Sequence, residues 1–302
     1  MACYHPIKGY RARTMNSSGK RPIVFNVNAG FADLPVEVPC GQCIGCRIAR
    51  SRAWAVRCVH EASLHEKNIF VTLTYSNECL PEGGTLVLKH FQDFMKRLRF
   101  KYGSGIRFFH CGEYGDEDMR PHYHAILFNH DFEDKYIWKK SGEAEHILWR
   151  SPSLEELWPW GHSCFGAVTF QSAAYCARYV MKKMTGPYSV IYEPHMDEVT
   201  GEIYGHRLPP YVTMSRRPGL AKGWYEKFAG DVYPDDFVIL LDGTKSATPA
   251  FYDKQLPEDE LRKIKSSRVI AARRHAANNT PDRLAVREVV QEARLSRLKR
   301  DL

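Results

Sequence analysis

Two histidines separated by one residue, His122 and His124, have a spacing that could support metal chemistry. They lie in the run from Arg120 to Phe128, whose apolar end predicts a strand. Alternate side chains of a strand share a face, so both imidazoles point the same way, with Cα atoms about 6–7 Å apart. Most such pairs are structural or solvent-exposed. Here, however, two polar residues open an apolar strand, and burying them without a ligand would be costly.

A carboxylate is the expected third ligand of this pair. Glu113 is the nearest good candidate, with Asp116 behind it. A hairpin of strands at 106–114 and 121–128 would bring Glu113 beside the two histidines. One carboxylate, two imidazoles and open positions suit Mg²⁺ or Mn²⁺ better than a closed zinc site.

Tyr175 and Tyr179 are four residues apart in a segment with a helical pattern. This spacing places both phenols on one helix face, with Lys182 or Lys183 a turn further along. A phenol with a pKa of about 10 is a poor nucleophile at neutral pH. A nearby ammonium group and a metal-polarised phosphate would help its phenolate form and attack. The alternative is an aromatic pair that packs on the core.

A run of cysteines near the N-terminus predicts a second metal site. Cys40, Cys43 and Cys46 follow Pro39 at intervals of three residues. Three thiolates leave one place in a tetrahedral zinc site, for Cys3 or His5. Reduced cysteines without metal and an iron–sulfur cluster are the alternatives. Four protein ligands would close a zinc site, so a structural role is expected.

The elements that must position these residues alternate between strand and helix patterns, which predicts an α+β domain around an antiparallel sheet. The pattern predicts helices at 49–65, 89–101 and 172–184, with Ser172 as the N-cap of the last. It predicts strands at 68–75, 106–114 and 121–128 and a short strand at 168–170. Residues 131–165 have only weak signals, and 187–256 are interpreted as extended loops with short elements.

Composition divides the chain into three parts and indicates a polyanionic partner. Residues 1–50 form a cysteine-containing segment expected to pack on the core, 51–256 the main domain, and 257–302 a basic helical tail. The net charge is +8, which suits phosphate neutralisation. The tail is interpreted either as a DNA-contacting arm or as a solvated amphipathic helix. The absence of long apolar runs predicts no membrane association and a cytoplasmic location.

The motifs together resemble those of the HUH endonuclease superfamily. The resemblance rests on Thr72–Tyr75, on Glu113 with His122 and His124, and on the helix that contains Tyr175, Tyr179 and Lys183. Within that superfamily the chain is similar to replication-initiation proteins of small single-stranded-DNA phages, the microviruses of the gokushovirus type. The stretches 39–46, 112–115 and 216–224 are also similar to that family, and the likeness covers roughly residues 1–230.

The resemblance implies rolling-circle replication of viral DNA inside a bacterial host. One tyrosine would cut the single-stranded origin, remain bound to the 5′-phosphate and leave a 3′-OH for the host replication machinery. A second tyrosine would cut the regenerated origin, so that cutting and joining alternate. The resemblance also implies an antiparallel sheet of about five strands.

Carried onto this sequence, the resemblance assigns His122 and His124 as metal ligands, with Glu113 as the third. Tyr175 and Tyr179 become nucleophiles, and Lys183, with Lys182 second, becomes the electrostatic assistant. Two other classes of function stay open. One is a non-catalytic, zinc-containing nucleic-acid-binding protein, and the other is a metal-dependent hydrolase that uses water.

Overall fold

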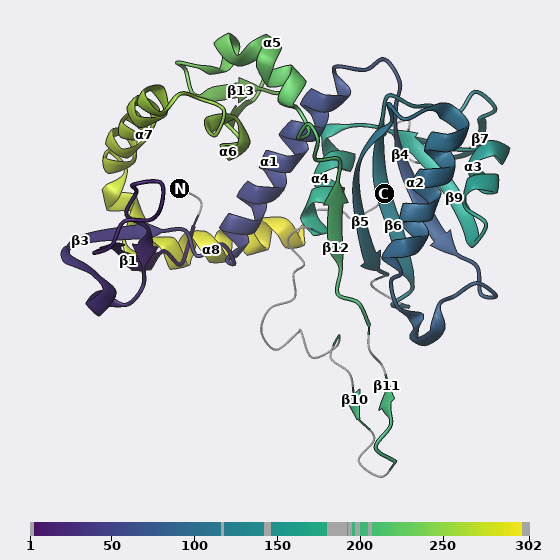
Figure 1. Ribbon diagram of the computed structural model, residues 1–302, viewed down its shortest axis with the longest axis horizontal. Helices are drawn as coiled ribbons and strands as arrows, with labels where there is room; N and C mark the ends of the chain where they lie inside the picture. The colour runs from purple at the N-terminus through teal and green to yellow at the C-terminus, as the bar shows by residue number, and fades with distance from the viewer. Residues whose placement is uncertain are drawn as a thin grey trace. The chain divides into compact units, whose positions relative to one another are not determined.

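The computed structural model describes residues 3–115, 118–141, 146–179, 192, 195–196, 200–204 and 207–297. The chain divides into two compact units (Figure 1). The larger unit is Ser51–Leu256, and the smaller unit combines Met1–Arg50 with Pro257–Leu302. The N-terminal segment and the basic tail, which the sequence presents as separate parts, thus belong to one unit.

A seven-stranded sheet is the centre of the larger unit, with the strand order β12-β5-β6-β4-β9-β8-β7. Every neighbouring pair is antiparallel. Its strands, in chain order, are β4 (Asn68–Tyr75), β5 (Arg107–Tyr114), β6 (Pro121–Phe128), β7 (Tyr136–Ser141), β8 (His146–Arg150), β9 (Gly161–Ala167) and β12 (Tyr211–Met214). The predicted α+β class is therefore confirmed, and the sheet is wider than the five strands that the resemblance implies.

Helices cover both faces of this sheet because its central strands alternate two sets of apolar side chains (Figure 1). On one face α2 (Leu88–Tyr102) and α3 (Pro152–Leu157) enclose the larger core. Members of this core include Val71, Leu73, Phe91, Phe94, Leu98, Tyr123, Leu127, Trp158 and Phe165.

On the opposite face α1 (Ile44–Ala62) and α4 (Phe170–Tyr179) pack over β5 and β6. The contact uses small side chains, because Ala55, Ala173 and Ala177 are fully buried there. Small residues let the helix backbones approach the sheet closely. The polar ends of the sheet on this face then lie within reach of side chains from α4.

The hairpin of β5 and β6 sets the register that the candidate site needs. Glu113 pairs with His122, and Cys111 pairs with His124. On the other side of β6, Thr72 of β4 pairs with His124. Directly paired residues share a face, so Thr72, Glu113, His122 and His124 face the same side of the sheet.

The insertion at 131–165 is more regular than its sequence indicates. It contains β7, β8, α3 and β9, of which α3 has only six residues. Elements this short carry little periodicity of their own, and pairing to the sheet stabilises them. The predicted strand at 168–170 is wrong: β9 ends at Ala167, and α4 begins at Phe170.

The region after residue 187 contains one element longer than expected, the helix α5 (Lys222–Val232). The remaining described elements there are short: β10 (His195–Met196), β11 (Ile203–Tyr204), β13 (Phe237–Ile239), β14 (Lys245–Ala247) and α6 (Ala250–Asp253). Residues 180–191, where the predicted helix would end, lie outside the described residues.

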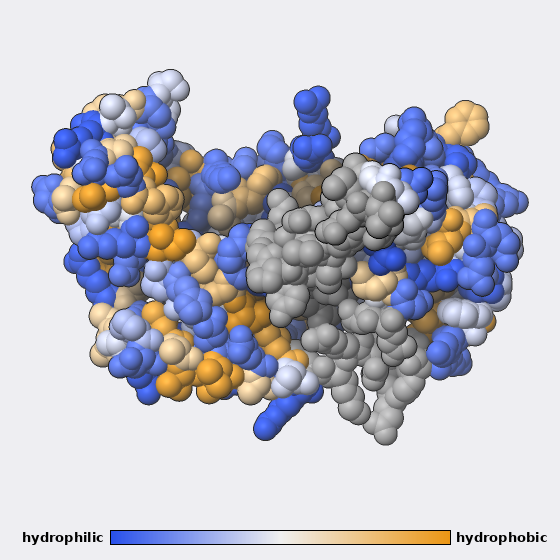
Figure 2. Space-filling model, turned by 90° about the horizontal axis from the view of Figure 1, so that it is seen from below, coloured by the Kyte–Doolittle hydropathy of each residue, from blue (hydrophilic) through white to orange (hydrophobic). Residues whose placement is uncertain are grey.

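The smaller unit contains a three-stranded sheet and two long helices. Its elements are β1 (Ile7–Ala12), β2 (Ile23–Val24), β3 (Gly30–Val38), α7 (Glu258–Arg273) and α8 (Pro281–Ser296). Within this unit His5 Nε2 lies 2.6 Å from Glu288 Oε2 of α8. Figure 2 shows hydrophobic side chains among hydrophilic ones at the surface, and α8 exposes Val286, Val289 and Val290.

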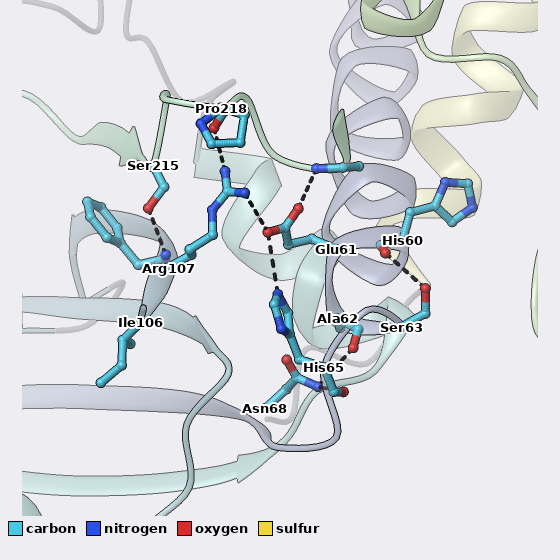
Figure 3. Close-up of polar contacts among 12 residues, drawn as sticks. His60, Glu61, Ala62, Ser63, His65, Asn68, Ile106, Arg107, Ser215 and Pro218 are labelled. Atoms are coloured by element: carbon cyan, nitrogen blue, oxygen red, sulfur yellow. Dashed lines mark hydrogen bonds and ion pairs between the residues drawn. The ribbon is translucent and has the colours of Figure 1, made fainter. Parts of the chain in front are cut away.

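A buried carboxylate, Glu61 of α1, connects three parts of the larger unit (Figure 3). One of its oxygens lies 3.0 Å from Arg107 of β5, and the other accepts a hydrogen bond of 2.6 Å from the backbone of Ala221. Arg107 also donates to the carbonyl of Pro218. The loop from 215 to 221, which precedes α5, is therefore fixed by charged side chains. Among the described helices, none combines the length and apolar composition needed to cross a bilayer.

The buried position of Glu61 makes its removal costly. Glu61→Ala leaves Arg107 without its carboxylate and the Ala221 N–H without an acceptor, and we expect a loss of about 3–5 kcal/mol in the free energy of unfolding. Urea denaturation followed by circular dichroism measures it. Glu66→Ala, at an exposed carboxylate nearby, is the control and should change stability by less than about 0.5 kcal/mol. Equal stabilities of the two variants would contradict this role.

Candidate active site and metal-binding groups

One carboxylate oxygen lies between the two predicted histidine ligands. Glu113 Oε1 is 3.0 Å from His122 Nε2 and 2.9 Å from His124 Nε2. The candidate ligand atoms of the three residues all lie within 4.8 Å of one another. The hairpin thus brings together the three residues that the sequence analysis grouped. We refer to Glu113, His122 and His124 as the triad.

Hydrogen bonds behind the two imidazoles fix their orientation. His122 Nδ1 is 3.0 Å from the carbonyl oxygen of Arg120. A carbonyl only accepts, so Nδ1 carries the proton and the neutral ring turns the lone pair of Nε2 toward Glu113. His124 Nδ1 is 3.0 Å from the hydroxyl of Thr72. Thr72 lies in one of the motifs, but only the register of β4 on β6 reveals this contact with His124.

Two buried atoms of the triad show why these residues fit a metal ion. Glu113 Oε2 and His124 Nε2 are buried, and neither makes a hydrogen bond of normal geometry with the described residues. Unpaired buried polar atoms are costly, and a cation could be coordinated by both. Two neutral imidazoles and a carboxylate form an incomplete ligand set for a divalent ion, which leaves positions for other oxygen ligands.

Burial and mutual charge set the protonation of the triad. Burial raises the pKa of Glu113, but the hydrogen bonds and charges of His122 and His124 outweigh it and leave that pKa below its ordinary value. Burial lowers the pKa of His124 more than Glu113 raises it. Burial also lowers the pKa of His122, but there Glu113 outweighs it, and the net shift is upward. The carboxylate is therefore ionised and His124 neutral at pH 7, as metal ligands must be.

Tyr175 of α4 contacts the triad directly. Its hydroxyl donates a hydrogen bond of 3.1 Å to Glu113 Oε1, the oxygen that lies between the histidines. Its ring meets the ring of His124 edge-on, with centroids 5.0 Å apart and an interplanar angle of 86°. The sequence predicted only that this phenol lies on a helix, and the packing of α4 on the sheet brings it to the triad.

The start of α4 is fixed by reciprocal hydrogen bonds. The N–H of Ser172 donates to Thr169 Oγ1 at 3.0 Å, and the N–H of Thr169 donates to Ser172 Oγ at 2.8 Å. This is a capping box in which Thr169 is the N-cap. The prediction of Ser172 as the N-cap is therefore wrong by three residues, because Ser172 supplies the return bond.

The other predicted catalytic residues fall outside what the structure describes. Tyr179 is the last residue of α4, and its side chain is not among the described ones. Lys182 and Lys183 lie outside the described residues, as does Asp116. Their predicted roles therefore stay predictions.

The four cysteines of the smaller unit form a second candidate metal group. The sulfur atoms of Cys3, Cys40, Cys43 and Cys46 all lie within 4.8 Å of one another. Cys3 Sγ is 3.7 Å from Cys40 Sγ and 3.9 Å from Cys43 Sγ, too far for disulfides. His5, the alternative fourth ligand, pairs with Glu288 instead. The geometry thus selects Cys3.

Backbone N–H groups point at these sulfur atoms, as is favourable for thiolates. The N–H of Tyr4 donates to Cys43 Sγ at 3.3 Å, and that of Cys40 donates to Cys3 Sγ at 3.2 Å. Burial raises the pKa of Cys43, but hydrogen bonds from Tyr4, Cys46 and Cys40 lower it to about 6. Burial raises the pKa of Cys3. Four thiolates this close repel one another, and a cation would relieve that repulsion.

Comparison with known proteins identifies relatives of this chain. The sequence profile of a family described as replication-associated protein ORF2 matches residues 68–184, which include the triad and α4. The replication-associated protein VP4 of Bdellovibrio phage phiMH2K is 31% identical over 263 residues, which cover 83% of this chain and 76% of the relative.

Two further relatives are similar over shorter stretches. The replication-associated protein ORF2 of Spiroplasma virus 4 is 33% identical over 61% of this chain and 62% of its own length. The replication-associated protein ORF4 of Chlamydia phage 1 is 35% identical over 48% of this chain and 38% of its own length. No solved structure matches the chain significantly.

The chain belongs to the family of phage replication-associated proteins. The match to the Bdellovibrio phage protein extends over most of both chains and over both units. The resemblance to microvirus initiators of rolling-circle replication, stated above from the motifs, is thereby confirmed.

Proposed function

We propose that this protein initiates replication by nicking single-stranded DNA at the viral origin, with a tyrosine as the nucleophile. The observation that carries the proposal is the hydrogen bond from the Tyr175 hydroxyl to Glu113 Oε1. The same oxygen lies within 3.0 Å of both histidine Nε2 atoms. A candidate nucleophile and a candidate metal site thus share one atom. Membership of a replication-associated family supports the choice of substrate.

In this proposal the triad holds a divalent metal ion, Mg²⁺ or Mn²⁺. Glu113 contributes a carboxylate oxygen, and His122 and His124 contribute their Nε2 atoms. When bound, such an ion acts as a Lewis acid that polarises a phosphoryl oxygen of the DNA. Arg120 and Thr72 act indirectly, since they hold the two rings in the orientation that directs Nε2 toward the site.

The reaction exchanges one phosphodiester for another. The Tyr175 oxygen forms a bond to phosphorus, and the bond between phosphorus and the 3′ oxygen breaks. The phenolic proton ends on the 3′ oxygen, which leaves as a free 3′-OH. The products are a 5′-phosphotyrosine and a primer terminus, so no water and no external energy source are consumed. Because one ester replaces another, a 3′-OH can reverse the step and join strands.

A second nucleophile would let cutting and joining alternate. Tyr179 lies one turn after Tyr175 on α4 and takes this role in the proposal. Lys183, with Lys182 second, would stabilise the phenolate and the phosphate electrostatically. In the infected bacterium, the free 3′-OH would be extended by the host replication machinery in the cytoplasm.

The cysteine group is proposed to hold a structural zinc ion. Its four thiols match the ligand set of a closed tetrahedral site, which leaves no position for substrate. The ion would connect Cys3, near the N-terminus, to the start of α1. Its function is therefore to fold the smaller unit.

The tyrosine mechanism predicts a covalent protein–DNA adduct. With Mn²⁺ and a labelled origin oligonucleotide, the wild-type protein should give a band that survives denaturing electrophoresis. Tyr175→Phe and Tyr179→Phe should each keep some cleavage or fail only in joining, whereas the double variant should form no adduct. Phe keeps the ring packing, so the loss isolates the hydroxyl.

Tyr102→Phe, at a half-exposed tyrosine of α2, is the matched control and should form a normal adduct. Peptide mapping locates the label. A label on neither Tyr175 nor Tyr179 would exclude the mechanism. Cleavage without an adduct would indicate a hydrolase that uses water, and binding without cleavage would indicate a non-catalytic nucleic-acid-binding protein.

The zinc proposal predicts about one equivalent of metal per purified chain. Elemental analysis should find zinc, and Cys43→Ser should reduce it below about half an equivalent. Cys79→Ser, at a free cysteine outside the group, should leave it unchanged. Metal binding of this kind contributes on the order of 10 kcal/mol to folding, so chelation should unfold the smaller unit first. Iron in place of zinc, or no metal, would contradict the prediction.

A further inference from the structure

A continuous row of paired residues leads from the triad across the sheet. His124 of β6 pairs with Thr72 of β4, and Thr72 pairs with Cys164 of β9. Residues directly opposite each other share a face of the sheet. Thr72 and Cys164 therefore extend the face of the triad away from α4.

The row continues to the edge of the sheet through β8. Trp149 pairs with Phe165, which places the next residue, Arg150, beside Cys164. The pKa of Cys164 agrees with this placement: burial raises it, and the charge of Arg150 lowers it. Arg150 in turn pairs with Tyr136 of the edge strand β7. Four strand spacings, roughly 19 Å, separate β6 from β7.

Exposure increases along this row toward an aromatic edge. His124 is 7% exposed, whereas Tyr136 is 47% and Trp138 is 51% exposed. The guanidinium carbon of Arg150 lies 5.9 Å from the centre of the Trp138 ring, which places Trp138 at the same end of the row. Two large aromatic rings at an exposed sheet edge are costly in water unless they have a ligand.

Basic side chains accompany these rings. Lys139 and Lys140 follow Trp138 on β7 and are exposed, and neither makes an ion pair within the described part of the chain. The hairpin from 135 to 150 carries four Lys and Arg against two Glu. Arg150 is paired with Glu155 at 2.8 Å, so the free positive charge lies mainly on β7. We call Tyr136, Trp138, Lys139 and Lys140 the edge patch.

We propose that the edge patch binds the bases and phosphates of single-stranded DNA that extends from the triad across the sheet. This inference rests on the proposed function, because it extends the substrate of that site. Exposed aromatic rings stack on bases of any sequence, and lysines neutralise the backbone. A duplex would hide the base faces that Tyr136 and Trp138 can contact, so the patch fits a single strand.

The test is binding of a fluorescent oligothymidylate of about 16 nucleotides, within the usual range of site sizes, without added Mg²⁺ or Mn²⁺. Trp138→Ala should weaken binding about tenfold, since one base–aromatic stack has that effect. Trp138→Phe keeps a stacking surface and should restore most of the affinity. The double variant Lys139→Gln, Lys140→Gln should lower the salt dependence of binding by about one to two counterions.

Phe100→Ala is the matched control, because Phe100 is 95% exposed on α2, the helix that covers the opposite face. It should bind the oligonucleotide as the wild type does. Duplex DNA of equal length should bind Trp138→Ala and the wild type equally.

Three results would overturn the inference: single-strand affinity of Trp138→Ala equal to that of the wild type, equal losses for duplex and single strand, or an altered oligomeric state of the DNA-free variant. The last result, seen by light scattering, would make the patch a contact between copies of the chain. Binding requires no cleavage, so the absence of an adduct contradicts the proposed function and leaves this measurement intact. Conversely, Trp138→Ala should still form the adduct at saturating DNA.

Discussion

A single oxygen atom, Glu113 Oε1, contacts side chains from two secondary-structure elements besides its own. It lies within 3.0 Å of His122 and His124 on β6 and accepts the hydroxyl hydrogen of Tyr175 on α4. A buried carboxylate is unfavourable unless it is paired, so the fold must keep all three partners in place. The same requirement, transferred to a cation, explains why two buried atoms of the triad lack hydrogen bonds of normal geometry. The arrangement is that of a site that binds a metal and presents a phenol beside it.

The rest of the larger unit can be understood as the support for this contact. The β5–β6 register sets Glu113 opposite His122, and β4 supplies the hydroxyl that orients His124. Alanines of α1 and α4 let the helices approach the sheet, and this brings Tyr175 down to the carboxylate. On the opposite face, a large aromatic core fixes the sheet itself. The protein therefore uses ordinary packing to hold an electrostatically demanding group.

Much of this could be predicted from sequence, and the limits have physical causes. His122 and His124 share a strand face by period alone, and a hairpin brings Glu113 to them, so the triad followed from local pattern. The contact of Thr72 with His124 depends on strand pairing over fifty residues and could not be read locally. The strands β7 and β8 were missed because short polar–aromatic segments gain their order from neighbours such as Phe165. Thr169, rather than Ser172, caps α4, and the capping box is visible only in three dimensions.

The central claim is that the triad binds one divalent cation, and a Mn²⁺ titration followed by electron paramagnetic resonance tests it most directly. The wild-type protein should bind one Mn²⁺ ion, whereas Glu113→Gln and His124→Ala should each weaken binding at least about tenfold. Tyr175→Phe should retain the ion, because the phenol is a neighbour of the triad and not a ligand. His162→Ala, which removes an exposed histidine from β9 on the same face, should also retain it. Mn²⁺ binding by Glu113→Gln and His124→Ala as tight as that of the wild type would contradict the account.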